Sequence, residues 1–99
     1  MSNLVFLVGG GILQLPIAYE IKQRGYDLLV TDNNFEASCK GLVDIFIQLS
    51  TYDVVGHLAL VDDFIESPVV VLTDAADVGP TVSALTEFLG LSGMPYHIR

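Results

Sequence analysis

The sequence has little positive charge and few of the residues that build disulfides or metal sites. Its 99 residues include four Lys and Arg against twelve Asp and Glu, for a formal net charge of −8 at pH 7. Nucleic acids and anionic membranes are bound by Lys and Arg that displace counterions, so neither is an expected partner. The single cysteine, Cys39, excludes an internal disulfide, and we expect a small, partly buried residue in a reducing compartment. The two histidines and Cys39 lack ligand spacing, so no metal site is expected, and we place His57 at the surface.

An evident targeting segment is also lacking. The N-terminus has neither the basic stretch nor the small-residue cleavage site of a signal peptide. The apolar stretch 4–18 is interrupted by three glycines, Gln14 and Pro16, and is too broken for a membrane span. We therefore expect a cytoplasmic protein. Because 52% of so short a chain is hydrophobic, we also expect part of the surface to meet a partner.

The chain is organised around residues 4–16. The run 4–8 is continuously apolar, as in a parallel strand that is covered on both faces. Three glycines follow at 9–11 and allow a tight turn with room for a ligand, and Pro16 suits the first turn of a helix. Backbone N–H groups at such a helix start favour an anion. We interpret this stretch first as a structural turn between strand and helix and second as a candidate binding site.

Strand and helix patterns alternate four times along the chain. Apolar and β-branched segments predict strands over 26–31, 44–49 and 69–72 in addition to 4–8. Helical spacing predicts helices after Pro16, after a cap at Ser50 or Thr51, and from Pro80, the last with a buried stripe that includes Phe88. Such alternation is typical of a parallel sheet with right-handed crossovers. We therefore predict an α/β, Rossmann-like, three-layer αβα fold with a four-stranded parallel sheet in the order 3-2-1-4.

The glycine turn partly matches the fingerprint of dinucleotide-binding proteins. Gly9 and Gly11 occupy its first two required positions, but Gln14 replaces the third glycine, which normally allows close packing of helix on strand. Asp32 ends the second strand about 20 residues after Gly11, near the place of an acid that binds ribose. A stand-alone module that binds NAD, NADP or FAD through Gly9, Gly11 and Asp32 is therefore an alternative hypothesis.

The same glycine segment resembles the opening of the ATP-grasp carboxylate ligases. This superfamily includes biotin carboxylase, carbamoyl-phosphate synthase and the purine-pathway ligases. The resemblance rests on the order and spacing of the segments 9–16, 25–26, 30–34, 50–53, 73–82 and 89–93. It covers nearly the whole chain but only the N-terminal domain of that family. It implies a Rossmann-like domain over residues 1–93 and a tail, 94–99, that leads to an ATP-grasp region outside this sequence.

In the resembled family the N-terminal domain forms one wall of the acceptor-substrate site and does not hold ATP. By position, the resemblance points to Gly10, Gly11 and Leu13 in the first loop and to Asp74 and Asp77 after the fourth strand. Either carboxylate would hold a substrate amine or accept a proton, whereas the alternatives are that Asp77 caps the last helix and Asp74 is solvated.

The resemblance also implies what the parent protein would do. It would join a carboxylate to an amine through an acylphosphate, with ATP and magnesium bound outside this chain. This chain alone is expected to be inactive. The resemblance also implies that the surface normally covered by the ATP-grasp region is exposed here, so we expect a homodimer. A non-catalytic protein-interaction domain is a further alternative, favoured by the apolar composition.

The predicted strand order places the candidate cleft. Ligands of open parallel sheets bind at the carboxyl ends of the strands, where the strand order reverses. In the order 3-2-1-4 this point lies between the first and fourth strands. We therefore expect the loops 9–14 and 73–79 to face each other, with backbone donors on one side and Asp74 on the other, around a zwitterion or an aminated phosphate.

Overall fold

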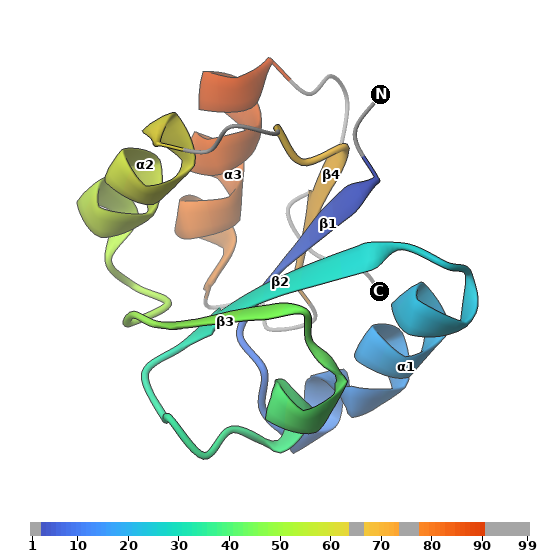
Figure 1. Ribbon diagram of the computed structural model, residues 1–99. Coiled ribbons are helices and arrows are strands. Elements are labelled where there is room, and N and C mark those ends of the chain that lie inside the picture. Colours follow the sequence, from blue (N-terminus) through green and yellow to red (C-terminus); the bar gives the residue numbers. More distant parts are fainter. Residues whose placement is uncertain (1–2, 64–66, 74–77, 91–99) are drawn as a thin grey trace.

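The protein is a four-stranded parallel sheet between two layers of helices (Figure 1). The computed structural model describes residues 3–63, 67–73 and 78–90. The elements follow the chain in the order β1 (Leu4–Val8), η1 (Ile12–Gln14), α1 (Leu15–Gln23), β2 (Asp27–Asp32), η2 (Ser38–Leu42), β3 (Ile45–Gln48), α2 (Val54–Asp62), β4 (Val70–Leu72) and α3 (Gly79–Leu89). The strands lie in the order β3-β2-β1-β4, so the predicted fold and strand order are confirmed. In these ranges no helix is long and apolar enough to cross a membrane.

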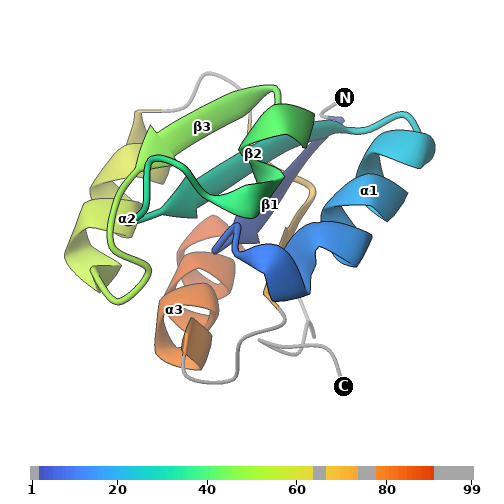
Figure 2. The ribbon, with the colours of Figure 1, turned by 90° about the horizontal axis from the view of Figure 1, so that it is seen from below.

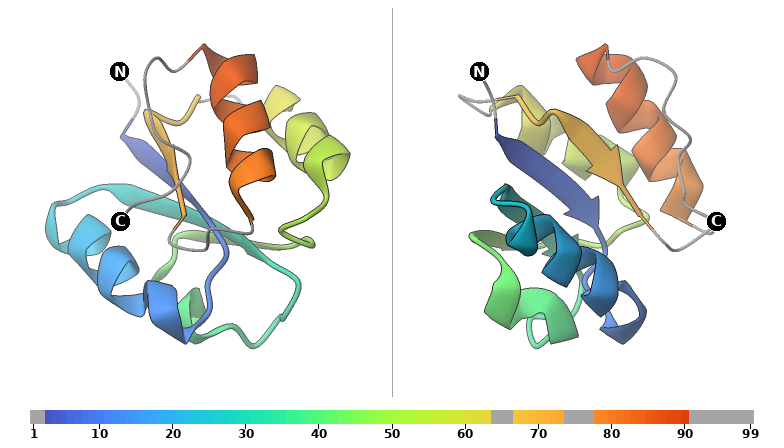
Figure 3. Two further views of the ribbon diagram at one scale, coloured as in Figure 1. Left: turned by 180° about the vertical axis from the view of Figure 1, so that it is seen from behind. Right: turned by 90° about the vertical axis from the view of Figure 1, so that its right-hand side faces the viewer.

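The helices divide between the two faces of the sheet. α2 and α3 lie together on one face, and α1 with the short η2 covers the other (Figure 1, Figure 2). Figure 3 shows α3 beside β4, with α1 across the sheet from it. The core under α2 and α3 contains Leu4, Phe6, Val8, Leu29, Val61, Val71, Val78, Val82 and Leu85. The core under α1 contains Val5, Leu7, Ala18, Ile21, Leu28, Val30 and Cys39.

β1 is a central strand that is buried on both faces. All five of its residues are buried, and Phe6 lies opposite Leu29 of β2 and Val71 of β4. Because successive side chains point to opposite faces, Phe6 enters the core under α2 and α3, and Leu7 enters the core under α1. Burying each large apolar side chain stabilises the fold by about 2 kcal/mol, so the most apolar run of the chain takes the centre of the sheet.

The start of α2 differs from the sequence-based prediction in its cap and in its buried face. Asp53 is the N-cap in place of Ser50 or Thr51, and its carboxylate accepts the N–H of Gly56 at 2.8 Å. A helix that starts from this cap turns residues 57 and 61 toward the sheet. His57 is therefore wholly buried, and its expected place at the surface was wrong.

α3 begins near Pro80, as predicted, but one residue of its predicted buried stripe lies outside the buried face. Pro80 lies in the first turn, and Gly90 ends the helix in the left-handed conformation. The buried stripe follows Val82 and Leu85 at helical spacing. Phe88 lies off this stripe and is 52% exposed, so its predicted burial was wrong.

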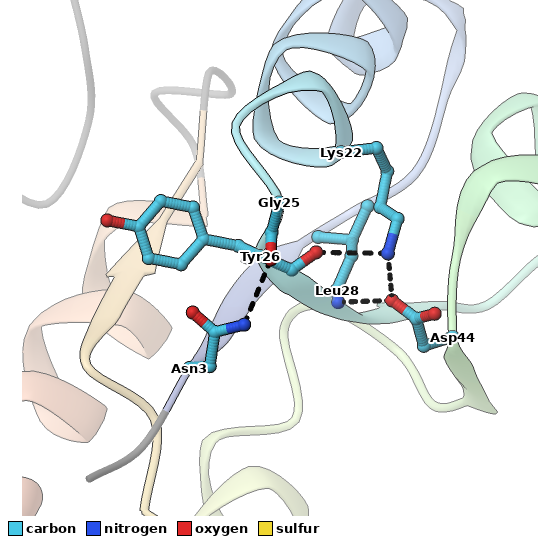
Figure 4. A network of polar contacts seen from close by, with 6 residues as sticks. All are labelled: Asn3, Lys22, Gly25, Tyr26, Leu28 and Asp44. Atoms are coloured by element: carbon cyan, nitrogen blue, oxygen red, sulfur yellow. Dashed lines mark hydrogen bonds and ion pairs between the residues drawn. The ribbon is translucent and has the colours of Figure 1, made fainter.

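A polar network fastens α1 and the segment before β3 to the start of β2 (Figure 4). Lys22 Nζ lies 2.6 Å from Asp44 Oδ2 and donates to the carbonyl oxygen of Tyr26 at 2.9 Å. The same carboxylate oxygen accepts the N–H of Leu28 at 2.7 Å. These donors, Lys22 first, hold the pKa of Asp44 below its ordinary value. One carboxylate therefore joins the segment before β3 to the end of α1 and the start of β2.

Replacing Asp44 by Asn is expected to lower the free energy of unfolding by about 1 kcal/mol at neutral pH, because two charge-assisted bonds weaken at a partly exposed site. The depressed pKa means that this stabilisation is present above the unfolded-state pKa of about 3.9 and is lost as the pH falls through the lower folded-state pKa. Urea unfolding at pH 7 and near pH 3 measures both effects. Glu36→Gln, which neutralises an exposed loop carboxylate, is the matched control and should change stability by less than about 0.5 kcal/mol. An Asp44→Asn variant as stable as the wild type at pH 7 would contradict this role.

Candidate functional site

A cleft of about 390 Å³ lies at the carboxyl edge of the sheet, where the strands end. Its lining residues come from four segments and are Gly9, Gly11, Ile12, Leu13, Gln14, Asp32, Thr51, Tyr52 and Val78. We call residues 9–14 with Asp32 the glycine wall, and Thr51 with Tyr52 the second wall. Open parallel sheets bind their ligands at this edge, so the cleft is the candidate functional site.

The turn after β1 requires glycine at two positions. Gly9 has a φ of +92°, and its N–H donates to the carbonyl oxygen of Thr31 at 2.7 Å. A Cβ on Gly10 would lie 2.8 Å from Val30 Cγ1, and the Gly10 N–H donates to Asp32 Oδ2 at 2.8 Å. The turn is thus pressed onto the end of β2. Gly10, predicted to contact substrate, lies behind the cleft and is not among its lining residues.

Gly11 and the residues after it face the cleft. A Cβ added to Gly11 would meet no atom within 4 Å, and Leu13 is 81% exposed. Among the described residues, the backbone N–H groups of Gly11, Ile12 and Leu13 have no hydrogen-bond acceptor. They lie where η1 leads into α1, and backbone donors at a helix start favour anions. This run of donors suits a phosphate or a carboxylate.

Gln14 holds the turn after β1 in place through its side-chain amide. Its side chain is buried, and Nε2 donates to the carbonyl oxygens of Val8 at 2.8 Å and Gly9 at 2.7 Å. Thr73 Oγ1 donates to the same Val8 oxygen at 2.9 Å. In the dinucleotide fingerprint this position is a glycine that leaves room for close helix packing. Here the amide side chain fills that room, so the sequence departure at Gln14 is a structural feature of the turn.

Both carboxylate oxygens of Asp32 accept backbone N–H groups beside the cleft. Oδ2 accepts the Gly10 N–H, and Oδ1 accepts the N–H of Asn34, each at 2.8 Å. The structure therefore brings Gly9, Gly11 and Asp32 to one cleft, as the dinucleotide hypothesis requires. The carboxylate already shapes the loop, however, and its negative charge at the cleft suits an amine as well as a hydroxyl.

The second wall was not identified from the sequence. Thr51 and Tyr52 follow β3, and Tyr52 is 64% exposed. The carbonyl oxygen of Thr51 accepts the hydroxyl of Thr81 at 2.6 Å, which ties this wall to α3. The sequence could have indicated these two residues only by their place after a predicted strand, because residues that follow a parallel strand lie at the carboxyl edge of the sheet.

The structure shows part of the predicted arrangement in which the loops 9–14 and 73–79 face each other. β4 pairs with β1, with Val5 opposite Val70, so the first and fourth strands are neighbours. Val78, near the end of the predicted second loop, lines the cleft together with the glycine wall. Asp74 and Asp77 lie outside the described residues, so their contact with a substrate stays a prediction.

Cys39 supports the turn as a buried residue. Its N–H donates to the carbonyl oxygen of Gly10 at 2.9 Å, and its side chain is wholly buried. Burial raises the pKa of the Cys39 thiol, and the nearby negative charge of Asp32 raises it further. The thiol is therefore a poor nucleophile at neutral pH, consistent with the packing role expected from the sequence.

The described residues do not fit a magnesium nucleotide. They contain no group of three or more His, Cys, Asp or Glu residues that could hold a metal ion. Lys22 is paired with Asp44, and Lys40 Nζ lies 3.1 Å from the centroid of the Phe35 ring. Magnesium nucleotides are usually held by carboxylates and by a lysine that contacts the phosphates. Residues outside the described ranges would have to supply such groups.

Known proteins resemble this chain in structure. No protein-family model matches the sequence, and no curated protein sequence matches it significantly. N5-carboxyaminoimidazole ribonucleotide synthetase from Thermotoga maritima matches with a TM-score of 0.70 and 21% identity, over 93% of this chain and 24% of its own. An ADP complex of N5-carboxyaminoimidazole ribonucleotide synthetase matches with a TM-score of 0.72 and 22% identity, over 89% of this chain and 23% of its own. UDP-glucose 4-epimerase from Thermotoga maritima matches with a TM-score of 0.60 and 16% identity, over 86% of this chain and 33% of its own.

The synthetases are ATP-grasp ligases, so these matches confirm the resemblance found in the motifs at the level of the fold. Identities of 21% and 22% show a shared fold and not a shared activity. The chain spans 23% and 24% of the two synthetase chains. It has the fold of one part, less than a quarter in length, of the ATP-grasp synthetases.

Proposed function

We propose that this chain is the substrate-side domain of an ATP-grasp carboxylate–amine ligase and is not catalytic alone. The observation that carries the proposal is the cleft at the carboxyl edge of a sheet whose fold is that of the synthetases. The glycine wall supplies the backbone donors of Gly11, Ile12 and Leu13. These features support a role in holding the acceptor that receives the activated carboxylate.

The chemistry of the cleft favours an acceptor that carries both an amine and an anionic group. The N–H donors of residues 11–13 suit a phosphate or carboxylate, and Asp32 offers a negative charge nearby. Gly10 shapes the wall from behind, and Asp74 and Asp77 are proposed as further contacts to the amine. Leu13 and Tyr52 add exposed apolar surface at the rim, which suits a ring or chain between the two polar ends.

The remaining parts of the reaction would come from outside the described residues. In the proposed parent ligase, ATP and magnesium would be bound outside this chain and would supply the activation of the carboxylate, while residues 1–93 would hold the acceptor. We propose a cytoplasmic location, supported by the single buried thiol of Cys39.

The face of α1 is the proposed surface for association with a second copy. An apolar groove of about 620 Å³ lies between α1 and the strands β1 and β4, and another of about 560 Å³ lies toward η2. Pro16 borders both grooves, so α1 forms a ridge with a groove on each side. A two-fold axis would place the ridge of each copy in a groove of the other. The protein as a whole is acidic, but the exposed ion pair between Glu20 and Arg24 adds no net charge to this face. Repulsion between two copies is therefore reduced there.

A dinucleotide-binding module is the second candidate function. It is favoured by the cleft lined with Gly9, Gly11 and Asp32. It is disfavoured by Gln14, whose buried amide occupies the place of the third fingerprint glycine.

Phosphoethanolamine, which carries one amine and one phosphate, is expected to bind the chain with a dissociation constant of about 1 mM, as so small a ligand allows. Gly11→Ala should weaken this binding at least about threefold, because a methyl group would stand among the free donors without disturbing the fold. Isothermal titration calorimetry measures both affinities, with inorganic phosphate and ethanolamine as partial ligands.

Gly10→Ala is the matched control for that experiment. Its added Cβ would press on Val30 behind the cleft, so it should lower the free energy of unfolding by about 1–3 kcal/mol. Gly11→Ala should leave stability nearly unchanged, since nothing lies within 4 Å of its Cβ. Unaltered binding by a folded Gly11→Ala variant would remove the glycine wall from the proposed site.

NAD and NADP are expected to show no binding to the chain at concentrations up to about 1 mM, because Gln14 closes the turn and the described sheet lacks the second half of a dinucleotide site. Calorimetric titration checks this directly. Micromolar affinity for either nucleotide would favour the dinucleotide module over the ligase domain.

The chain is expected to form a dimer that Ile17→Glu weakens, because a charge would enter the groove beside α1. Val55→Glu is the control: it adds the same charge to a side chain on α2 that is 78% exposed, and it should leave the mass unchanged. Light scattering across a concentration series at high salt gives the mass of each variant. A monomeric wild type under these conditions would rule out the association.

A further inference from the structure

The side chain of His57 connects the two walls of the cleft from inside the core. Its imidazole is wholly buried and stacks on the ring of Phe6, with centroids 5.9 Å apart and an interplanar angle of 20°. Nδ1 lies 2.8 Å from the carbonyl oxygen of Asp53, and Nε2 lies 2.7 Å from Thr31 Oγ1. Both ring nitrogens therefore have a partner, and the two partners belong to different segments.

These contacts determine the tautomer of the neutral ring. A carbonyl oxygen only accepts hydrogen bonds, so Nδ1 must carry the proton that bonds to Asp53. Nε2 of the neutral ring then accepts, and the hydroxyl of Thr31 donates to it. Burial lowers the pKa of His57 and outweighs the opposite effect of the Asp53 carbonyl and carboxylate. The neutral, Nδ1-protonated ring is thus the form present at neutral pH.

Each partner of the ring is coupled to one wall. The carbonyl oxygen of Thr31 accepts the N–H of Gly9 at 2.7 Å, and the next residue, Asp32, holds Gly10. Asp53 follows Thr51 and Tyr52 directly, and its N–H donates to the carbonyl oxygen of Ser50 at 3.0 Å. The imidazole is therefore the buried polar link between the glycine turn and the segment that carries the second wall.

We propose that His57 is a positioning residue that sets the glycine wall and the second wall of the cleft relative to each other through Thr31 and Asp53. The proposal deepens the proposed function, on which its relevance to substrate rests, but its geometry concerns the chain without a ligand. A neutral imidazole can donate one hydrogen bond to the Asp53 carbonyl oxygen and accept one from Thr31 at the same time. An imidazolium would have two donors, so Thr31 Oγ1 would have to accept and turn its own proton elsewhere in a buried site.

Protonation should therefore loosen both walls together. Phe6 of β1 and Thr31 of β2, which contact the ring, are uncharged. The charged group that acts on the ring among the described residues is Asp53 of α2, whose carboxylate already accepts the Gly56 N–H. Because the folded-state pKa lies below the ordinary value of about 6.5, the link is intact above that pH and is lost as the pH falls through the folded-state pKa.

Amide hydrogen exchange of the 99-residue chain tests the proposal by NMR at about pH 7.5. The readout is the exchange rate at Gly9 and at Asp53 relative to that at Leu7 of β1, so that the contribution of global unfolding cancels. His57→Asn retains a donor near the Nδ1 position and loses the contact with Thr31, so exchange at Gly9 should accelerate about tenfold relative to Leu7. His57→Gln, whose amide reaches toward the Nε2 position, should restore much of the protection at Gly9. In the wild type, the Gly9 and Asp53 resonances should shift with the same midpoint as the His57 ring.

Two further variants distinguish a positioning role of His57 from a general loss of stability. Val82→Ala removes volume from the same core without touching either wall, and it should leave the ratio of Gly9 to Leu7 unchanged. Thr31→Val removes the hydroxyl while keeping a similar volume, and it should loosen Gly9 even if the His57 variants do not fold. An unchanged ratio in His57→Asn and Thr31→Val, or an equal change in Val82→Ala, would overturn the positioning role. No ligand is added, so this result is independent of whether phosphoethanolamine binds the cleft.

Discussion

The turn at the carboxyl end of β1 is the constraint on which the rest of the structure depends. β1 is buried on both faces, so the chain leaves the sheet at its edge and must turn at once. Gly9 does this with a positive φ, and Gly10 approaches β2 so closely that no side chain fits. Gln14 and Asp32 then secure the turn from two sides. Within the part of the chain that the structure describes, the N–H groups of residues 11–13, which follow this turn beside the cleft, have no acceptor.

Strands and their order were predictable because they depend on local and topological rules. The apolar run 4–8, the β-branched run 69–72 and the alternation with helices define a parallel sheet and its right-handed crossovers. The glycine turn was also visible, since only glycine tolerates such geometry. These features follow from the residue types themselves, and the structure confirms the order β3-β2-β1-β4.

The polar interior of the site was not predictable in the same way. Burial of His57 depends on the rotation of α2, which is set by the cap at Asp53 and by the shape of the sheet beneath. The role of Gln14 depends on the paths of two carbonyl groups in the turn. Tyr52 lines the cleft only because β3 ends beside β2, a tertiary fact. Sequence patterns report apolar periodicity well, and they say little about which polar groups meet inside.

The proposed function depends on the same turn as the fold. A single buried amide, Gln14, separates this glycine turn from a dinucleotide fingerprint, while free donors and Asp32 favour a compact ligand with an amine and an anion. The chain has the fold of about a quarter of each synthetase chain, and in the proposed function the cleft is one wall of a larger site. Such a wall would bind its ligand weakly until the rest of the site closes over it.

A crystal structure of the chain with saturating phosphoethanolamine is the most direct measurement of this assignment. We expect the phosphate within hydrogen-bond distance of the backbone N–H groups of Gly11, Ile12 and Leu13, with the ammonium group on the side of Asp32. Electron density for the ligand in the groove between α1 and β4, or an empty cleft at full saturation, would contradict it.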